Sequence, residues 1–247
     1  MIKSLIYGTL LTLTFITSAS ATQLRFAEGS PNRGARAEAV IHFMEDVTKR
    51  SDGDLTFDIH WSGALLNYKS MVNGVAGGTA DLGTMLAAYS PRKLRSLTIG
   101  DVPTQYSDPW VGMRAMYELM TTNAEMQNLL AEQGFVYLTG YSSTGAQFEC
   151  TEGNAIRTVD DISGKRMRAA GNFAKILDDL GANLVNLNIS DAYQAYDTGL
   201  IDCGASYFYT IRAFKTFEVA NNYTITNWGQ LLGFATLMNI DVWNGLT

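Results

Sequence analysis

The segment from Asp161 to Cys203 constrains the fold of this 247-residue chain more than any other part of the sequence. Its apolar runs and glycines predict alternating strands and helices. The predicted elements are a strand at Arg166–Ala170, a turn at Gly171, a helix ending at Gly181, a strand at Asn183–Leu187 and a helix ending at Gly199. This order and spacing indicate an α/β lobe with parallel strand pairing.

The first half of the chain shows the same alternation. Strands are predicted at Leu24–Ala27, Leu55–His60, Ala80–Met85 and Phe135–Tyr141, and helices at about Ala35–Lys49, at Tyr68–Val75 and from Pro109 onward. In the first helix Val40, Phe43, Met44 and Val47 lie at i, i+3, i+4 and i+7, so this apolar stripe should pack on a sheet. The stretch 142–160 is polar and predicted to be irregular.

These elements predict two lobes. We expect the first to span 22–144, with 233–247 returning to it, and the second to span 145–232, with the main crossing near Gly145. Residues 1–21 are predicted to be a cleaved signal peptide, because Lys3 precedes a mainly apolar run and Ala19-Ser20-Ala21 forms a small-residue cleavage site. An uncleaved anchor is the weaker alternative, since the run is short for a membrane span. We therefore expect a periplasmic protein that begins at Thr22.

Composition excludes several classes of partner and site. The chain has 18 Lys and Arg against 24 Asp and Glu, a net charge of −6, which disfavours nucleic acid and anionic lipid as partners. Cys150 and Cys203 are the only cysteines, and in an oxidising compartment we expect them to form a disulfide, with two buried free thiols as the alternative. The two histidines, His42 and His60, lack ligand spacing, so no metal and no cofactor are expected.

Enzyme signatures are weak in this sequence. The run from Gly140 to Gly145 resembles a serine-hydrolase turn, but its second glycine comes one position late. Gly164-Lys165 is followed by Arg166 rather than by Ser or Thr, which excludes a phosphate-binding loop. A periplasmic hydrolase using Ser142 or Ser143 and a ligand sensor remain as alternatives to a binding protein.

Two motifs in the central segment resemble a known family. Asp161-Ile162-Ser163-Gly164 is followed by Lys165, Met167 and Arg168, and Ala192-Tyr193 with Ala195 and Gly199 precedes Ile201-Asp202. This pattern is similar to the DctP-family solute-binding proteins of tripartite ATP-independent periplasmic (TRAP) transporters. In that family the arginine of the first motif receives the substrate carboxylate, which implies that role for Arg168.

The resemblance carries further expectations. It implies an α/β, two-lobed periplasmic binding protein fold of the type II-like (Venus flytrap) kind, with mixed, mostly parallel sheets flanked by helices. The implied function is capture of a small organic acid by a monomer, without enzymatic activity, and delivery to a TRAP membrane permease. The family continues for several helices beyond the position of Thr247, so we expect a C-terminally truncated sequence; a naturally short protein is the alternative.

The residues also favour Arg168 independently of the family. Strand alternation places Arg166 and Arg168 on one side, and only Arg168 is near the carboxyl end of the strand, where ligands of open α/β sheets bind. A guanidinium offers two parallel donors that match a carboxylate. The alternative is that Arg168 belongs to a cluster of solvated surface charges. The other candidate ligand contacts are Gln147, Phe148, Ser206, Tyr207 and Tyr209 from the second lobe, and Glu28 and Tyr89 from the first.

The candidate set has few charges and several rings. The family often supplies a second arginine about one strand before the first motif, where this chain has Gly145-Ala146-Gln147-Phe148-Glu149. With few cations and aromatic rings at Tyr207–Tyr209, the predicted ligand is a less charged or partly apolar acid.

Overall fold

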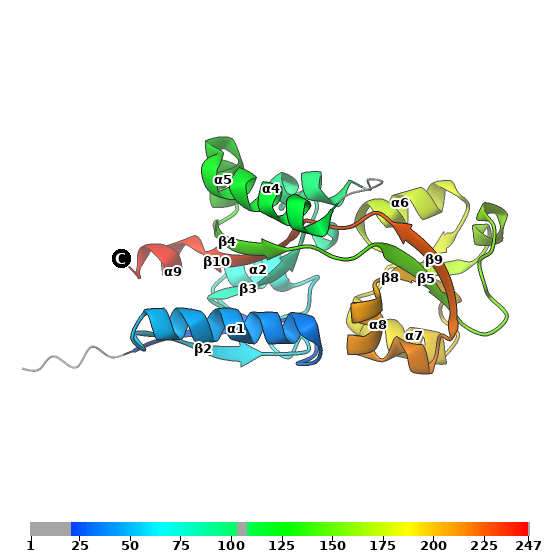
Figure 1. Cartoon of the computed structure of the whole chain (residues 1–247), viewed down its shortest axis with the longest axis horizontal. Helices are drawn as coiled ribbons and strands as arrows, with labels where there is room; N and C mark the ends of the chain where they lie inside the picture. Colours follow the sequence, from blue (N-terminus) through cyan, green and yellow to red (C-terminus); the bar gives the residue numbers. More distant parts are fainter. Residues whose placement is uncertain (1–20, 103–107, 247) are drawn as a thin grey trace, which may run out of the picture.

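Two five-stranded sheets organise the chain into two lobes that lie side by side in the computed structural model (Figure 1). The structure describes residues 21–102 and 108–246. The predicted signal peptide therefore lies almost entirely outside the described residues. Each sheet mixes parallel and antiparallel strands and is flanked by helices, as predicted for the α/β fold class.

The first lobe is built on a sheet with the strand order β2-β1-β3-β10-β4. Its strands are β1 (Thr22–Ala27), β2 (Leu55–His60), β3 (Leu82–Leu86), β4 (Phe135–Tyr141) and β10 (Phe234–Asn239). The first three strands pair in parallel, and β10 inserts antiparallel between β3 and β4. The strand β10, near the C-terminal end of the described chain, therefore lies in the same sheet as β1, near its N-terminal end.

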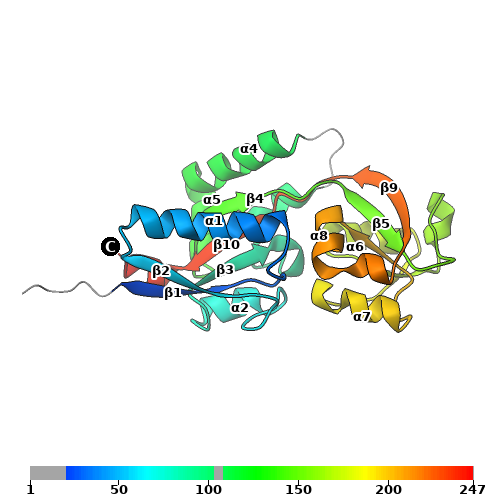
Figure 2. The same cartoon turned by 60° about the horizontal axis from the view of Figure 1, so that its bottom comes forward.

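Helices cover this first sheet. They are α1 (Ala35–Arg50), α2 (Met71–Ala76), η1 (Ala87–Tyr89), α3 (Arg95–Thr98), η2 (Ile99–Asp101), α4 (Pro109–Thr122), α5 (Ala124–Ala131) and α9 (Ile240–Asn244). Val40 and Met44 of α1 are buried, because the apolar stripe of that helix packs against the sheet. The N-terminal end of α1 points toward the second lobe (Figure 2).

The second lobe has the strand order β7-β6-β8-β5-β9. Its strands are β5 (Ala146–Cys150), β6 (Arg166–Arg168), β7 (Asn183–Leu184), β8 (Cys203–Ser206) and β9 (Asn222–Trp228). Its helical segments are η3 (Val159–Ile162), α6 (Gly171–Asp179), η4 (Ile189–Asp191), α7 (Ala192–Asp197), α8 (Phe208–Phe214) and η5 (Thr216–Glu218). Cys150 and Cys203, the pair expected from the sequence, are direct partners on β5 and β8 and are joined by a disulfide.

The polar stretch that we expected to be irregular contains β5. The run from Ala146 to Cys150 alternates apolar and polar residues, a strand pattern that our prediction did not use, and the structure buries both faces, including Gln147 and Glu149. The buried polar side chains are hydrogen-bonded instead, Gln147 to β9 and Glu149 to the hydroxyl of Thr216. In the same lobe, the two strands predicted in the central segment are shorter than expected.

Two extended segments, 142–145 and 229–233, connect the lobes and run side by side (Figure 1). The backbone N–H of Ser143 donates to the carbonyl of Leu231 at 2.8 Å, and the N–H of Leu231 donates to the Ser143 hydroxyl at 2.7 Å. A Cβ atom on Gly145 would lie 2.9 Å from the backbone of Asn227. The absence of a side chain there allows the first segment to approach the end of β9 closely.

Candidate functional site

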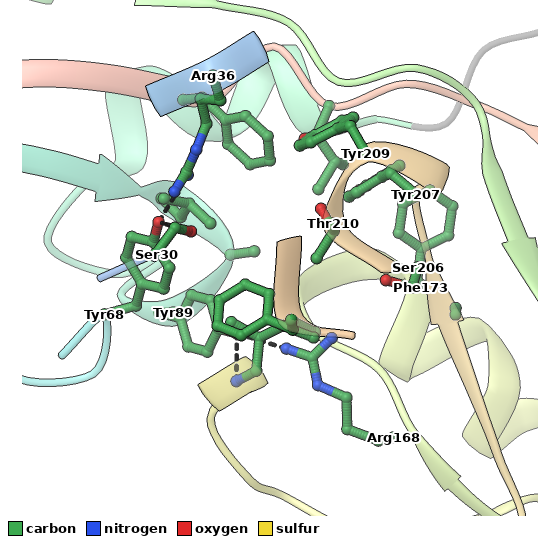
Figure 3. A pocket seen from close by; sticks show the side chains of 18 residues that line it. Ser30, Arg36, Tyr68, Tyr89, Arg168, Phe173, Ser206, Tyr207, Tyr209 and Thr210 are labelled. Carbon is green, nitrogen blue, oxygen red and sulfur yellow. Dashed lines mark hydrogen bonds between the residues drawn. The ribbon is translucent and has the colours of Figure 1, made fainter. Parts of the chain in front are cut away.

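A pocket with a cavity volume of about 50 Å³ lies between the two lobes (Figure 3). Both lobes contribute to its wall. The wall includes Ser30, Arg36, Tyr68 and Tyr89 from the first lobe, Arg168, Phe173, Ser206, Tyr207, Tyr209 and Thr210 from the second, and Phe234 from β10. This volume corresponds to the space of a few water molecules, so the arrangement suits a small ligand.

Arg168 is the last residue of β6 and lines the pocket while only 7% exposed. Its Nη2 atom donates a hydrogen bond to the hydroxyl of Tyr89. Its Nε atom is buried and has no hydrogen-bond partner among the described residues. By contrast Arg166, two positions earlier, is exposed and pairs with Asp202. Arg168 is therefore a buried cation with donor capacity left for a ligand in the pocket.

Tyr89 lies in η1, directly after β3, and connects the two lobes at the pocket. Its hydroxyl accepts hydrogen bonds from Arg168 and from the backbone N–H of Ile189, the latter at 3.3 Å. Its ring stacks on that of Tyr68, with 5.7 Å between the ring centroids. Tyr89 thus orients the guanidinium of Arg168 from the opposite lobe.

Three further hydrogen bonds cross between the lobes. Arg33 Nη1 donates to the carbonyl of Ala213 at 2.8 Å, Lys69 Nζ to that of Asn186 at 3.2 Å, and Asn172 Nδ2 to that of Asp101 at 2.9 Å. The lobes are therefore in contact around the pocket, in a closed arrangement.

Arg36, in the first turn of α1, lies across the pocket from Arg168 (Figure 3). It donates to the hydroxyls of Tyr68 and Tyr141 at 2.6 and 3.0 Å and to Glu28 Oε1 at 2.8 Å. The sequence led us to expect few cations at the site, and we did not single out this arginine. Arg36 precedes Val40 and Met44 by four and eight positions on the buried stripe of α1, a pattern that could have indicated it.

Aromatic rings form much of the remaining wall. Tyr207 and Tyr209 stack at 5.6 Å between centroids, and Tyr207 meets Phe234 edge to face at 6.4 Å. Phe173 of α6 closes the same side. Of the predicted contacts, the structure places Arg168, Tyr89, Ser206, Tyr207 and Tyr209 in the pocket wall.

The structure places three predicted contacts, Glu28, Gln147 and Phe148, outside this wall. Glu28 lies behind Arg36 and is fully buried. Gln147 Oε1 accepts from the N–H groups of Thr226 and Asn227, where β5 and β9 change register, so its amide satisfies donors freed by the irregularity. Phe148 packs on Trp228 in the core of the second lobe.

Glu149 lies behind Arg168 in the second sheet. It pairs with Gly204 of β8, which in turn pairs with Arg168 of β6, so both side chains stand in one row across the sheet. Gly204 leaves room between them for the hydroxyl of Tyr196, which a Cβ atom at Gly204 would meet. Burial raises the pKa of Glu149 to about 7, although the Thr216 hydroxyl and Arg168 act to lower it.

The residues expected from the hydrolase alternative are not assembled into a catalytic group. His42 pairs with Glu45 and His60 with Asp58, all on the surface, and the Ser143 hydroxyl accepts from the backbone of Leu231. Within the described ranges no set of three or more His, Cys, Asp or Glu side chains is arranged to hold a metal ion. Nor is any helix in those ranges long and apolar enough to cross a membrane.

Comparison with known proteins agrees with the fold. The sequence model of bacterial extracellular solute-binding protein family 7 (DctP) matches residues 26–247. A solute-binding protein of Sulfitobacter sp. (strain NAS-14.1) is 28% identical over 220 residues, which cover 87% of this chain and 65% of that protein. The chain spans 61–65% of the length of three such curated relatives.

Solved structures confirm the two-lobed fold. A TRAP periplasmic solute-binding protein from Sulfitobacter sp. NAS-14.1 with bound β-D-galacturonate has a TM-score of 0.80 and 22% identity, covering 92% of this chain and 75% of that one. A TRAP solute-binding protein from Rhodoferax ferrireducens T118 in complex with copurified benzoate has a TM-score of 0.81 and 19% identity, covering 92% and 71%. Because the family model matches nearly the whole described chain, this chain belongs to the bacterial extracellular solute-binding protein family 7 (DctP).

Proposed function

We propose that this chain is the periplasmic receptor of a TRAP transporter, which captures a small organic acid between its lobes and delivers it to a membrane permease. The observation that carries the proposal is Arg168, a buried guanidinium in the wall of the interlobe pocket whose Nε has no partner among the described residues. A buried cation with free donors is costly unless an anion completes it. A carboxylate fits, since it accepts two parallel N–H bonds.

Membership of the family and its known ligands support a carboxylate as the bound group. Galacturonate and benzoate, found in the two similar structures, each carry one carboxylate group. The aromatic wall at Tyr207 and Tyr209 would pack against the carbon skeleton of such an acid, which supplies apolar contact in addition to the charge pair.

The proposed mechanism is closure of the lobes around the ligand. The paired segments 142–145 and 229–233 would act as the hinge, because they carry the chain between the lobes, while the hydrogen bonds that cross the pocket boundary would break when the lobes separate. In the closed state Tyr89 of one lobe holds Arg168 of the other. A ligand that binds both walls would shift the population toward this state.

The receptor proposal predicts ligand-dependent stability and no turnover. A thermal-shift screen would include benzoate, galacturonate, lactate, pyruvate and succinate. An acid present at about 100 times its Kd should add roughly 2.7 kcal/mol of stability, which for a chain of this length raises Tm by on the order of 5–10 °C. Failure of every acid to raise Tm would contradict the proposal. Hydrolysis of an ester or amide substrate lost in Ser143→Ala would instead support the hydrolase alternative.

A further inference from the structure

The pocket wall that faces Arg168 also carries charged side chains. Their positive and negative charges cancel. Arg36 Nη2 and Glu28 Oε1 form an ion pair at 2.8 Å, in which the Glu28 side chain is fully buried and that of Arg36 is 14% exposed. Burial acts to lower the pKa of Arg36, but Glu28 together with the hydroxyls of Tyr141, Tyr68 and Tyr209 raises it by more, so the guanidinium stays charged. The pair contributes no net charge to the pocket.

The ion pair is held in a fixed geometry. Glu28 Oε1 also accepts from the hydroxyl of Tyr68 at 2.6 Å and from the backbone N–H of Ser30 at 2.8 Å. The Ser30 hydroxyl lies 2.7 Å from that of Tyr68. These bonds fix the carboxylate behind Arg36, so it cannot be displaced into the pocket by a competing anion without losing several hydrogen bonds.

The remaining acids near the pocket, Glu149 and Asp101, do not line it and are only partly ionised at neutral pH. Glu149 and Asp101 are both buried, and burial raises the pKa of each to about 7. Among the described residues that line the pocket, the cations are Arg36, whose charge Glu28 balances, and Arg168, so the pocket presents at most one uncompensated positive charge.

The far wall still offers donors to a neutral group. The three hydrogen bonds from Arg36 use three of its five N–H donors, which leaves two that no described residue accepts. The hydroxyl of Ser30 lines the same wall, and that of Thr210 lines the pocket from the second lobe. A keto, hydroxyl or amide oxygen could accept from this wall, whereas a second carboxylate would bring a charge that the Glu28 carboxylate opposes.

From this charge balance we infer that the ligand is a monocarboxylate with a neutral polar group at its opposite end, and that the Arg36–Glu28 pair selects against dicarboxylates. This inference rests on the proposed function, because it assigns the carboxylate to Arg168. Arg36 is then a specificity-determining residue that binds the neutral end, and Glu28 is a positioning residue that sets the charge of that wall.

The test compares dicarboxylates with their monoamides, which have nearly the same shape and one charge less. Calorimetric titration of the chain with malonamate against malonate, succinamate against succinate and 3-carbamoylbenzoate against isophthalate measures the charge preference. We expect the monoamide to bind at least about 30-fold more tightly in each pair that binds, since a second buried carboxylate would lack a cation.

Glu28→Gln tests the cause of that preference. Gln keeps an oxygen that accepts from Arg36, Tyr68 and Ser30 but removes the negative charge, so the wall becomes cationic. We expect the preference to shift toward the dicarboxylate by at least about tenfold. The double variant Glu28→Gln/Arg36→Gln restores a neutral wall and should restore the preference for the monoamide. If Glu28→Gln does not fold, the paired titrations of the unaltered chain decide.

Each result has one meaning. Equal or tighter binding of the dicarboxylates by the unaltered chain would overturn the inference and leave the proposed function standing. So would binding of benzoate or lactate without binding of any monoamide, because the far wall would then have no role in recognition. Failure of the folded chain to bind any acid in either panel would overturn the proposed function and this inference together.

Discussion

The guanidinium of Arg168 donates a hydrogen bond to the hydroxyl of Tyr89 across the boundary between the two lobes. The donor stands at the end of β6 in one lobe, and the acceptor lies in the helical turn after β3 in the other. The same hydroxyl accepts from the backbone of Ile189. One contact therefore links the orientation of the proposed ligand-binding cation to closure of the lobes.

Replacing Tyr89 by Phe should weaken ligand binding without unfolding the protein. The change removes the acceptor that holds Arg168 and Ile189 but keeps the ring that stacks on Tyr68. A hydrogen bond to a charged group is worth about 1.5–3 kcal/mol, so we expect roughly a 10- to 100-fold higher Kd in calorimetric titration. Tyr193→Phe, which removes an exposed hydroxyl bonded to Glu218, is the matched control and should leave Kd unchanged.

Ligand binding should take up protons near neutral pH. Glu149 stands behind Arg168, and its pKa of about 7 makes it partly ionised there. A ligand carboxylate on Arg168 would oppose the Glu149 charge and raise its pKa further, so the complex holds more protons than the free protein. By linkage, affinity should fall as pH rises through about 7.

Calorimetry at pH 7 in phosphate and in Tris measures this uptake, because the two buffers release protons with different enthalpies. The observed binding enthalpy should depend on the buffer in the unaltered chain and lose most of that dependence in Glu149→Gln. Equal enthalpies in both buffers for the unaltered chain would contradict the role assigned to Glu149.

The stability of the fold should decrease with rising pH because of Asp101. This carboxyl is 3% exposed; its Oδ1 accepts from the N–H of Gly233 at 2.8 Å, and its Oδ2 has no partner among the described residues. Burial raises its pKa to about 7, against which the Gly233 bond acts only in part.

The direction of this effect follows from linkage. The folded-state pKa of Asp101 lies above the unfolded value, so the folded state binds the proton more tightly. The stabilisation of the folded state by protonated Asp101 is fully present below about pH 4 and is lost as pH rises through 7. It amounts to about 4 kcal/mol. Glu149 acts in the same direction.

Urea denaturation between pH 5 and 8.5 checks this prediction. Asp101→Asn should lose part of the pH dependence and keep the part that comes from Glu149, while exposed Asp178→Asn should behave like the unaltered chain. A free energy of unfolding that rises from pH 5 to 8.5 would show that neither buried acid behaves as described.

The disulfide between Cys150 and Cys203 should stabilise the second lobe. It closes a loop with a sequence separation of 53, for which the chain-entropy model gives about 4 kcal/mol. The double variant Cys150→Ala/Cys203→Ala should lower the free energy of unfolding by up to this amount in non-reducing urea titrations. The unaltered chain with its thiols reduced should shift in the same direction, and no shift in either experiment would contradict the prediction.

The sequence predicted the fold class because the signals were local. The stripe of α1 and the glycine-punctuated segment that contains β6 and α6 each fall within a few turns of chain. In contrast, β5 and β10 are held by antiparallel partners distant in sequence. In β5 the apolar–polar alternation is present but spans only the five residues from Ala146 to Cys150 within a polar stretch, so its role in the second sheet was missed.

The site was predicted in part for the same reason. Arg168 stands at a strand end, where local pattern and topology agree. Arg36 was missed because its place opposite Arg168 depends on how α1 is set against the other lobe. Glu28 was expected to contact ligand, yet its carboxylate is used by Arg36 and Tyr68. Its position after β1 was readable from the sequence, but its partners were not.

The central claim is that Arg168 binds the carboxylate of the ligand, and calorimetric titration of an acid identified by thermal shift tests it most directly. Arg168→Ala should cost about 2–5 kcal/mol of binding free energy, and Arg168→Lys should recover only part, because an ammonium cannot reproduce the paired donors. Arg166→Ala, two positions away on the same strand and paired with Asp202 at the surface, should bind like the unaltered chain. Unchanged affinity in a folded Arg168→Ala variant would contradict the account.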